Sequence, residues 1–124
     1  MIVGLDHVQL AIPPGAEEKA RAFYVALLGM TELPKPPALA ARGGLWLRSG
    51  PAVIHLGVEK NFAPARKAHP ALTVDDLDAL ADRLAGAGFE LAWDDNIPGT
   101  RRFHVFDPLG NRLEFIAGNE GAHG

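Results

Sequence analysis

The chain has 124 residues, 48% of them hydrophobic and 22% charged, which is the composition of an ordinary folded protein. A formal net charge of −3 gives no electrostatic reason to expect a nucleic acid or an anionic membrane as a partner. Cysteine is absent, which excludes disulfides, thiolate metal ligands and cysteine nucleophiles. The N-terminus lacks the basic start of a signal peptide, and no apolar run approaches the roughly 20 residues that span a bilayer, so we expect a cytoplasmic protein.

Two segments of similar pattern open the two halves of the chain. A histidine followed by small or apolar residues occurs at 7–12 and again at 69–74, so the offset is 69 − 7 = 62 residues. Each segment alternates as a strand does. A stretch of helical periodicity follows each of them, at 16–28 in the first half and 75–87 in the second.

Further strands follow each predicted helix, separated by loops rich in Pro and Gly such as 34–37. The repeated order predicts an α+β fold of two paired βαβββ modules, with a curved mixed sheet and one helix per module. The later strands are expected at 31–33, 45–48 and 52–58, and then at 89–92, 101–107 and 112–117.

We expect the two modules to form a single domain. Module one covers 1–60, a linker covers 59–68, and module two covers 69–117. The Gly-rich segment 118–124, which contains His123, is expected to be a flexible tail.

Four predicted strands each place one side chain able to bind a metal on the face opposite their apolar one, because side chains alternate along a strand. A lone strand histidine is more often a surface residue than a ligand, but these four occupy equivalent places in the two halves. Neutral imidazole suits Zn²⁺, Ni²⁺, Fe²⁺ and Mn²⁺, and a carboxylate completes a mixed nitrogen and oxygen site. The candidates are His7 with its counterpart His69, and His55 with its counterpart Glu114.

The most specific motif is the turn Asp107-Pro108-Leu109-Gly110-Asn111 followed by Leu113-Glu114-Phe115. Together with Phe23-Tyr24 and Leu28-Gly29-Met30, it resembles the vicinal-oxygen-chelate superfamily. That superfamily includes glyoxalase I, fosfomycin-resistance thiol transferases, extradiol dioxygenases, methylmalonyl-CoA epimerase and bleomycin-binding proteins. The resemblance runs from Gly4 to Phe115 and implies the glyoxalase fold.

The resemblance also implies a ligand set and a partner. His7, His69 and Glu114 match the three ligand positions common to the thiol transferases and the extradiol dioxygenases. His55 matches a fourth position that is a ligand in glyoxalase I. Short members of the superfamily pair as homodimers, so each site would combine His7 and His55 of one chain with His69 and Glu114 of the other.

The implied activity is that of a metal-dependent lyase or isomerase acting on a small oxygen-chelating substrate, with a divalent Zn, Ni, Mn, Fe or Co ion as Lewis acid. Glu114 is expected to bind the metal and to carry a proton. Arg102 and His104 share a face of one strand, which by the resemblance lines the pocket. There Arg102 would clamp a carboxylate or phosphonate, or else be only a surface charge, and His104 would donate a hydrogen bond or shuttle a proton. Gln9 lies on the face of His7 and is expected to contact the substrate.

Two other functions remain open. An extradiol-type dioxygenase would need Fe²⁺ or Mn²⁺ and would consume oxygen. A metal-free binding or resistance protein would sequester an apolar ligand, but the four aligned ligands speak against it. The presence of only one suitable glutamate, Glu114, speaks against glyoxalase I proper.

Overall fold

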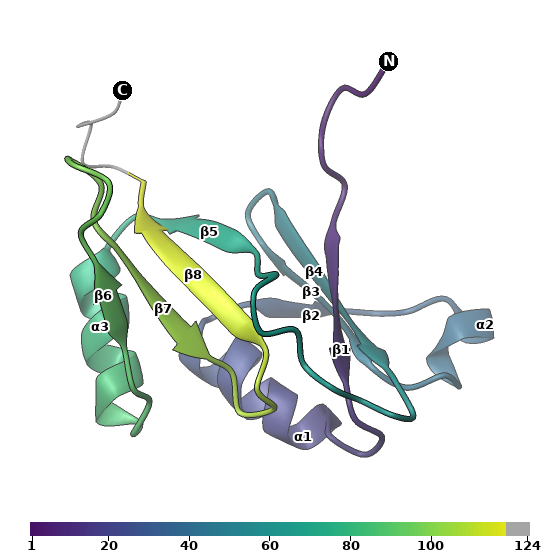
Figure 1. The fold of residues 1–124 in the computed structure, drawn as a ribbon. Coiled ribbons are helices and arrows are strands. Elements are labelled where there is room, and N and C mark those ends of the chain that lie inside the picture. Colours follow the sequence, from purple (N-terminus) through teal and green to yellow (C-terminus); the bar gives the residue numbers. More distant parts are fainter. Residues whose placement is uncertain (119–124) are drawn as a thin grey trace. The chain divides into compact units, whose positions relative to one another are not determined.

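The computed structural model describes residues 1–118 and divides the chain into two compact units, Met1–Pro64 and Ala65–Gly124. Each unit contains one four-stranded mixed sheet (Figure 1). The predicted tail, His123 included, falls outside the described residues except for Gly118. That the two units form a single domain stays a prediction.

The sheet of unit 1 has the order β1-β4-β3-β2. In this sheet β1 and β4, the first and last strands of the module, run parallel. The other two neighbouring pairs, β4 with β3 and β3 with β2, run antiparallel. The strands are β1 (Val8–Ile12), β2 (Thr31–Leu33), β3 (Leu45–Ser49) and β4 (Ala52–Val58).

The helical stretch of unit 1 differs in detail from its prediction. A short α-helix, α1 (Glu17–Ala20), continues into a π-helix, η1 (Arg21–Leu27), in which the amide of Leu28 reaches the carbonyl of Phe23 at 2.9 Å. A sequence periodicity of 3.6 residues indicates an α-helix and could not distinguish this wider π-helical turn from it. The predicted loop after β2 also contains one extra helical turn, α2 (Pro37–Ala40), which begins with a proline at its first position.

The sheet of unit 2 repeats the same topology, in the order β5-β8-β7-β6. Helix α3 (Leu77–Gly86) begins where the side chain of Asp76 accepts a hydrogen bond from the amide of Ala79 at 3.0 Å. The strand expected at 89–92 pairs only from Ala92 onward. The strands are β5 (Ala71–Val74), β6 (Ala92–Asp94), β7 (Arg102–Phe106) and β8 (Arg112–Ala117).

The register of the two sheets shows that the sequence repeat is a structural repeat. Gln9 pairs with His55 between β1 and β4, and Ala71 pairs with Glu114 between β5 and β8. His7 precedes Gln9 by two positions, as His69 precedes Ala71. The structure therefore confirms the predicted α+β fold of two βαβββ modules.

One face of each sheet is buried and apolar. The buried side chains include Ile54 and Leu56 of β4 and Phe103 and Val105 of β7, each at most 2% exposed. The alternate residues of these strands, among them His55 and His104, point to the other face. Within residues 1–118, no helix combines the length and apolar character needed to cross a membrane.

Candidate metal centre

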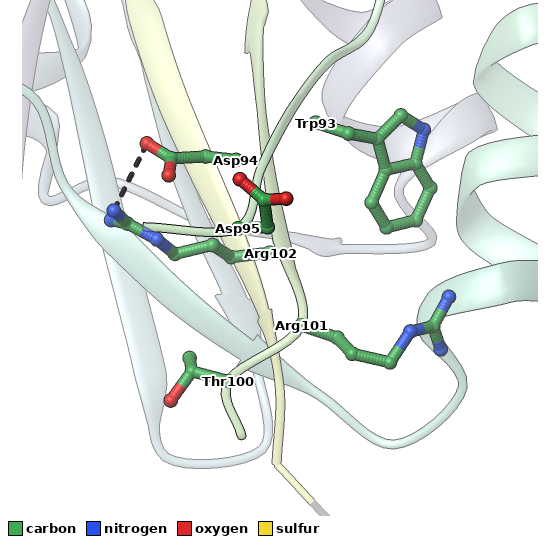
Figure 2. A pocket seen from close by; sticks show the side chains of 6 residues that line it. All are labelled: Trp93, Asp94, Asp95, Thr100, Arg101 and Arg102. Atoms are coloured by element: carbon green, nitrogen blue, oxygen red, sulfur yellow. Dashed lines mark ion pairs between the residues drawn. The ribbon is translucent and has the colours of Figure 1, made fainter. Parts of the chain in front are cut away.

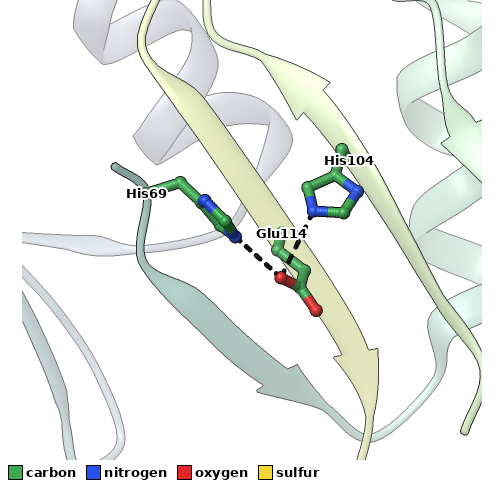
Figure 3. Close-up of side chains that lie close together, drawn as sticks. All are labelled: His69, His104 and Glu114. Carbon is green, nitrogen blue, oxygen red and sulfur yellow. Dashed lines mark hydrogen bonds and ion pairs between the residues drawn. The ribbon is translucent and has the colours of Figure 1, made fainter. Parts of the chain in front are cut away.

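Three side chains able to bind a metal converge on the polar face of the sheet in unit 2 (Figure 3). His69, His104 and Glu114 each offer one ligand atom, and these atoms lie within 4.8 Å of one another. Ligand atoms that bind one metal at about 2.1 Å lie roughly 3 to 4 Å apart, so the cluster is close to the spacing of a metal site.

The strand register sets this arrangement. His104 in β7 lies directly opposite Glu114 in β8, and His69 stands two residues before the first residue of β5, which pairs with β8 on the other side. Glu114 Oε1 lies 2.8 Å from His69 Nε2 and 3.3 Å from His104 Nε2. Two imidazoles therefore face one carboxylate oxygen from the two neighbouring strands.

His69 has the geometry of a ligating histidine. Its Nδ1 lies 2.8 Å from the carbonyl oxygen of Lys67, which is a hydrogen-bond acceptor. Nε2 faces Glu114 Oε1 at 2.8 Å, so a neutral ring, which carries a single N–H, can donate to only one of these two oxygens. Both ring nitrogens thus face oxygen acceptors. In metal-binding histidines, an oxygen acceptor at the nitrogen that does not bind the metal orients the ring. His69 Nε2 and Glu114 Oε1 together form a nitrogen and oxygen donor pair that suits a divalent cation.

Glu114 is a buried carboxylate, only 5% exposed, with separate partners for its two oxygens. Oε1 faces the imidazoles, whereas Oε2 accepts a hydrogen bond from Arg102 Nη1 at 2.9 Å. Burial by itself would raise the pKa of Glu114, but the hydrogen bonds from Arg102 and His69 and the positive charge of Arg102 hold it below the ordinary value of 4.5. The group is therefore ionised at neutral pH and can bind a cation through Oε1.

His104 is neutral at the same pH. Burial lowers its pKa below the ordinary value of 6.5, and the charge of Arg112 adds to this against the opposing charge of Glu114. His104 also lines a cavity of about 400 Å³ on this face, together with Arg66, Trp93 and Phe106, among other residues. An unprotonated imidazole at a cavity wall can accept a proton from a bound molecule.

Arg102, the expected substrate clamp, has both ends of its guanidinium engaged. It pairs with Glu114 at 2.9 Å and with Asp94 Oδ2 at 3.0 Å, and Figure 2 shows it turned toward Asp94 in β6. Its side chain is 15% exposed, and within residues 1–118 its buried Nε has no hydrogen-bond partner. In this structure Arg102 therefore orients Glu114, and its role toward a substrate stays a prediction.

A second cavity, of about 290 Å³, adjoins Arg102 at the outer strand β6 (Figure 2). The guanidinium of Arg101 lies 5.4 Å from the centre of the Trp93 ring and pairs with Asp78 of α3 at 2.6 Å. Arg101 thus contacts helix α3 and is not part of the cluster of His69, His104 and Glu114.

The other two predicted ligands, His7 and His55, are brought together in unit 1. Their rings stack with centroids 3.9 Å apart, and the ring of Trp46 stacks on the other side of His55 at 4.4 Å. Burial lowers the pKa of His55 below 6.5, and the charge of His7 lowers it further. His7 Nδ1 lies 2.8 Å from Asp6 Oδ1, so its Nε2 is the nitrogen left to bind a metal.

Gln9 lies beside this stack, as its alternation with His7 predicts. Its side chain crosses β4 above Gly57, where the amide nitrogen lies 2.7 Å from the position that a Cβ would take. It lines a cavity in unit 1 together with His55 and Trp46. Its contact with a substrate stays a prediction.

Sequence reasoning placed His104 in the pocket but not in contact with Glu114. The hairpin centred on Leu109 sets positions 104 and 114 opposite each other, and counting outward from the Asp107–Asn111 turn would have found this pair. The stack of Trp46 on His55 was also missed, because it depends on the register between β3 and β4.

The family model for the glyoxalase/bleomycin resistance protein/dioxygenase superfamily matches residues 4–115. Among solved structures, the chain is similar to a protein assigned to the glyoxalase family from Bacillus anthracis, with 50% identity over 94% of this chain and 96% of that one and a TM-score of 0.91. No curated protein matches the chain.

Two more distant structures share the fold. One is a mutant of the fosfomycin resistance protein FosX from Listeria monocytogenes, complexed with Mn(II) and a dihydroxypropylphosphonic acid, with 19% identity over 99% of this chain and 98% of that one and a TM-score of 0.79. The other is lactoylglutathione lyase from Agrobacterium tumefaciens, with 20% identity over 90% of this chain and 92% of that one and a TM-score of 0.66. The family match over residues 4–115 and the 50% identity to the Bacillus protein show that this chain belongs to the glyoxalase/bleomycin resistance protein/dioxygenase superfamily.

Proposed function

We propose that the protein is a divalent-metal-dependent enzyme of the lyase or isomerase type that acts on a small oxygen-chelating substrate. The observation that carries the proposal is the placement of His69 Nε2 2.8 Å from Glu114 Oε1, with His104 completing a cluster within 4.8 Å. Membership of a superfamily that includes metal-binding relatives such as FosX supports it.

The proposed ligands are His69 and Glu114, together with His7 and, as the fourth group, His55. Two observations favour His7 over His104 as a ligand. His7 and His69 each have Nδ1 held by an oxygen at 2.8 Å, whereas His104 has no such contact among the described residues. His104 also faces the same carboxylate oxygen from a longer distance, 3.3 Å. As the resemblance to the superfamily implies, His7 and His55 would come from a second copy of the chain in a homodimer.

When bound, the metal would supply a Lewis acid that polarises a substrate oxygen. The rest of the chemistry belongs to the chain. Glu114 remains ionised because Arg102 holds its Oε2, and neutral His104 accepts or returns a proton at Nε2 from its place at the wall of the 400 Å³ cavity. Trp93 and Phe106 line the same cavity and are 49% and 57% exposed, so they offer apolar surface that displaces water from a bound substrate.

The metal content of the purified protein tests the proposed ligand His69. Protein purified without chelators should contain about one transition-metal ion per chain, and His69→Ala should lose it while keeping its fold, because His69 lies on the face away from the core. Elemental analysis with circular dichroism measures both. Thr73→Ala is the matched control and should retain the metal. Thr73 is exposed and lies on the same face of β5 as Ala71, two positions further along the strand. Stoichiometric metal in the His69→Ala protein would contradict the assignment.

A second function is favoured by one observation. Two histidines and one carboxylate, as in the cluster of His69, His104 and Glu114, are the ligands of non-haem iron oxygenases. An extradiol-type dioxygenase therefore remains the alternative, and bound Fe²⁺ together with oxygen consumption in the presence of a catechol would select it. Failure to bind any of several divalent ions would leave the fold unchanged and make the protein a small-molecule binder.

A further inference from the structure

A cavity of about 340 Å³ in unit 1 carries positive charge that the proposed metal chemistry does not use. It opens on the polar face of the sheet, where Trp46, His55 and Gln9 form its floor. Lys35 and Arg42 reach it from the segment between β2 and β3. The other lining residues are apolar or glycine, so the wall contains two cations and no carboxylate.

The two cations lack acidic partners within the described part of the chain. Lys35 Nζ donates to the backbone carbonyl of Gly43, and neither Lys35 nor Arg42 forms an ion pair there. Glu17 interacts with Lys35 through its charge, but its Oε2 already accepts a hydrogen bond from the amide of Gly44 at 2.9 Å. The hydrogen bond from Gly44 is also the largest cause of the lowered pKa of Glu17, with Lys35 a minor one. The cavity wall therefore carries two cations without a direct ion pair among the described residues, and Glu17 compensates the charge of Lys35 only as a minor electrostatic interaction.

The backbone around the cavity is built to hold these side chains in place. Pro36 and Pro37 start the single turn α2, and Gly43 and Gly44 follow with φ angles of 76° and 81°. A Cβ on Gly44 would lie 2.1 Å from the carbonyl oxygen of Leu56, so only glycine permits this approach to β4. The segment is thereby turned back over the sheet, which sets Lys35 and Arg42 at the rim of the cavity.

We propose that this cavity binds the oxyanion end of a small organic substrate, a carboxylate, phosphate or phosphonate group. Lys35 and Arg42 supply charge-assisted hydrogen bonds, and the Gln9 amide donates another from the floor. The flat stack of Trp46 and His55 contacts the body of the ligand. As a substrate subsite this inference rests on the proposed function, because His55 belongs to the proposed ligand set.

The test uses metal-free protein, so that it does not depend on the metal centre. In a Trp93→Phe background, Trp46 is the one remaining tryptophan and its fluorescence reports on the cavity. Inorganic phosphate and acetate are titrated separately at constant ionic strength. The double variant Lys35→Gln/Arg42→Gln is compared with Lys19→Gln/Lys60→Gln, which removes the same charge from exposed positions of unit 1 outside the cavity.

We expect saturable binding of at least one anion, retained by the control and weakened at least about tenfold in the cavity variant. Phosphate alone, acetate alone or both would each support the site and would name the group that it prefers. No saturable response, or equal weakening in the two double variants, would overturn it. Should circular dichroism show that the cavity variant is unfolded, Arg42→Gln alone gives the same comparison, because Arg42 is exposed.

The two proposals fail separately. Loss of metal in His69→Ala with unchanged anion binding supports the metal centre independently of the cavity. Anion binding in a protein that takes up no metal would leave a binding protein for small acids.

Discussion

At the scale of single residues, the two oxygens of Glu114 have different partners and hence different tasks. Arg102 holds Oε2 at 2.9 Å, so Oε1 is the oxygen that faces His69 and His104. A metal would then be bound by one carboxylate oxygen, which leaves coordination positions for substrate. In this structure Arg102 acts on the site by orienting Glu114, whereas the sequence predicted a direct contact with the substrate.

The roles of the histidines can be separated by metal affinity. His7→Ala should weaken metal binding by more than about a hundredfold, because it removes a ligand, whereas His104→Ala should cost about ten- to a hundredfold, as loss of a neighbouring group does. Competition with a chromogenic chelator measures both affinities. The reverse order would assign His104 to the metal and His7 to the surface.

The stability of the metal-free protein should depend on pH through His55 and His104. Both have a pKa below 6.5 in the folded state, chiefly because of burial, so the unfolded chain binds more protons as the pH falls through 6.5. The free energy of unfolding is therefore at its full value above this pH and decreases below it. Urea unfolding at pH 7.5 and pH 5.5 measures the decrease, and His55→Gln/His104→Gln should show a smaller one. If the free energy of unfolding of the double variant decreased by as much as that of the wild type, groups other than His55 and His104 would cause the pH dependence.

At the scale of elements, the turn between β7 and β8 explains why its sequence is so distinctive. Asp107, only 4% exposed, accepts hydrogen bonds at Oδ1 from the amides of Leu109 and Asn111, at 2.9 and 2.8 Å, and at Oδ2 from the Asn111 side chain at 3.1 Å. Gly110 has a φ of 100°, which favours glycine. This turn sets the register that places His104 opposite Glu114.

Asp107→Ala should lower the free energy of unfolding by about 2 to 4 kcal/mol, because it leaves buried donors without their charged acceptor. It should also weaken metal binding, since the register of the hairpin positions two members of the cluster. Chemical denaturation gives the first quantity and chelator competition the second. Asp95→Ala, an exposed carboxylate in the β6–β7 connection, should change stability by no more than about 0.5 kcal/mol. Equal effects of the two substitutions would show that the turn contributes nothing special.

At the scale of the whole molecule, the N-terminal segment leaves apolar surface uncovered ahead of the edge strand β1. The side chains of Met1, Ile2, Val3 and Leu5 are all at least 81% exposed. Such a run of large apolar residues is costly to leave in water and is typical of a surface that another chain covers. It supports the proposed homodimer, in which a second copy would supply that cover.

The double substitution Ile2→Glu/Val3→Glu should therefore shift the protein from dimer to monomer in sedimentation, because it places two charges in the proposed contact. If the metal site is shared between copies, metal content should fall at the same time. Ile97→Glu, at another exposed apolar position, should leave the dimer intact. A wild-type monomer that carries a full complement of metal would show that one chain suffices for the site.

The sequence by itself determined the fold class, the internal repeat and the faces of the strands. The alternation at 7–12 and 69–74 is a local property, and burial of one sheet face follows directly from it. His7, His55, His69 and Glu114 could be singled out for the same reason, and their role as ligands stays a prediction. Local periodicity could not reveal the π-turn of η1 or the late start of β6, because both depend on hydrogen bonds that the pattern does not encode.

Only the tertiary structure decided which side chains meet. His104 reaches Glu114 because two strands pair in one register, and Trp46 covers His55 because two others do. Lys35 and Arg42 share a cavity because Gly44 allows the chain to return against β4. Each of these contacts joins residues distant in sequence, and such contacts are fixed by backbone pairing and close packing across the sheet, which local periodicity does not specify.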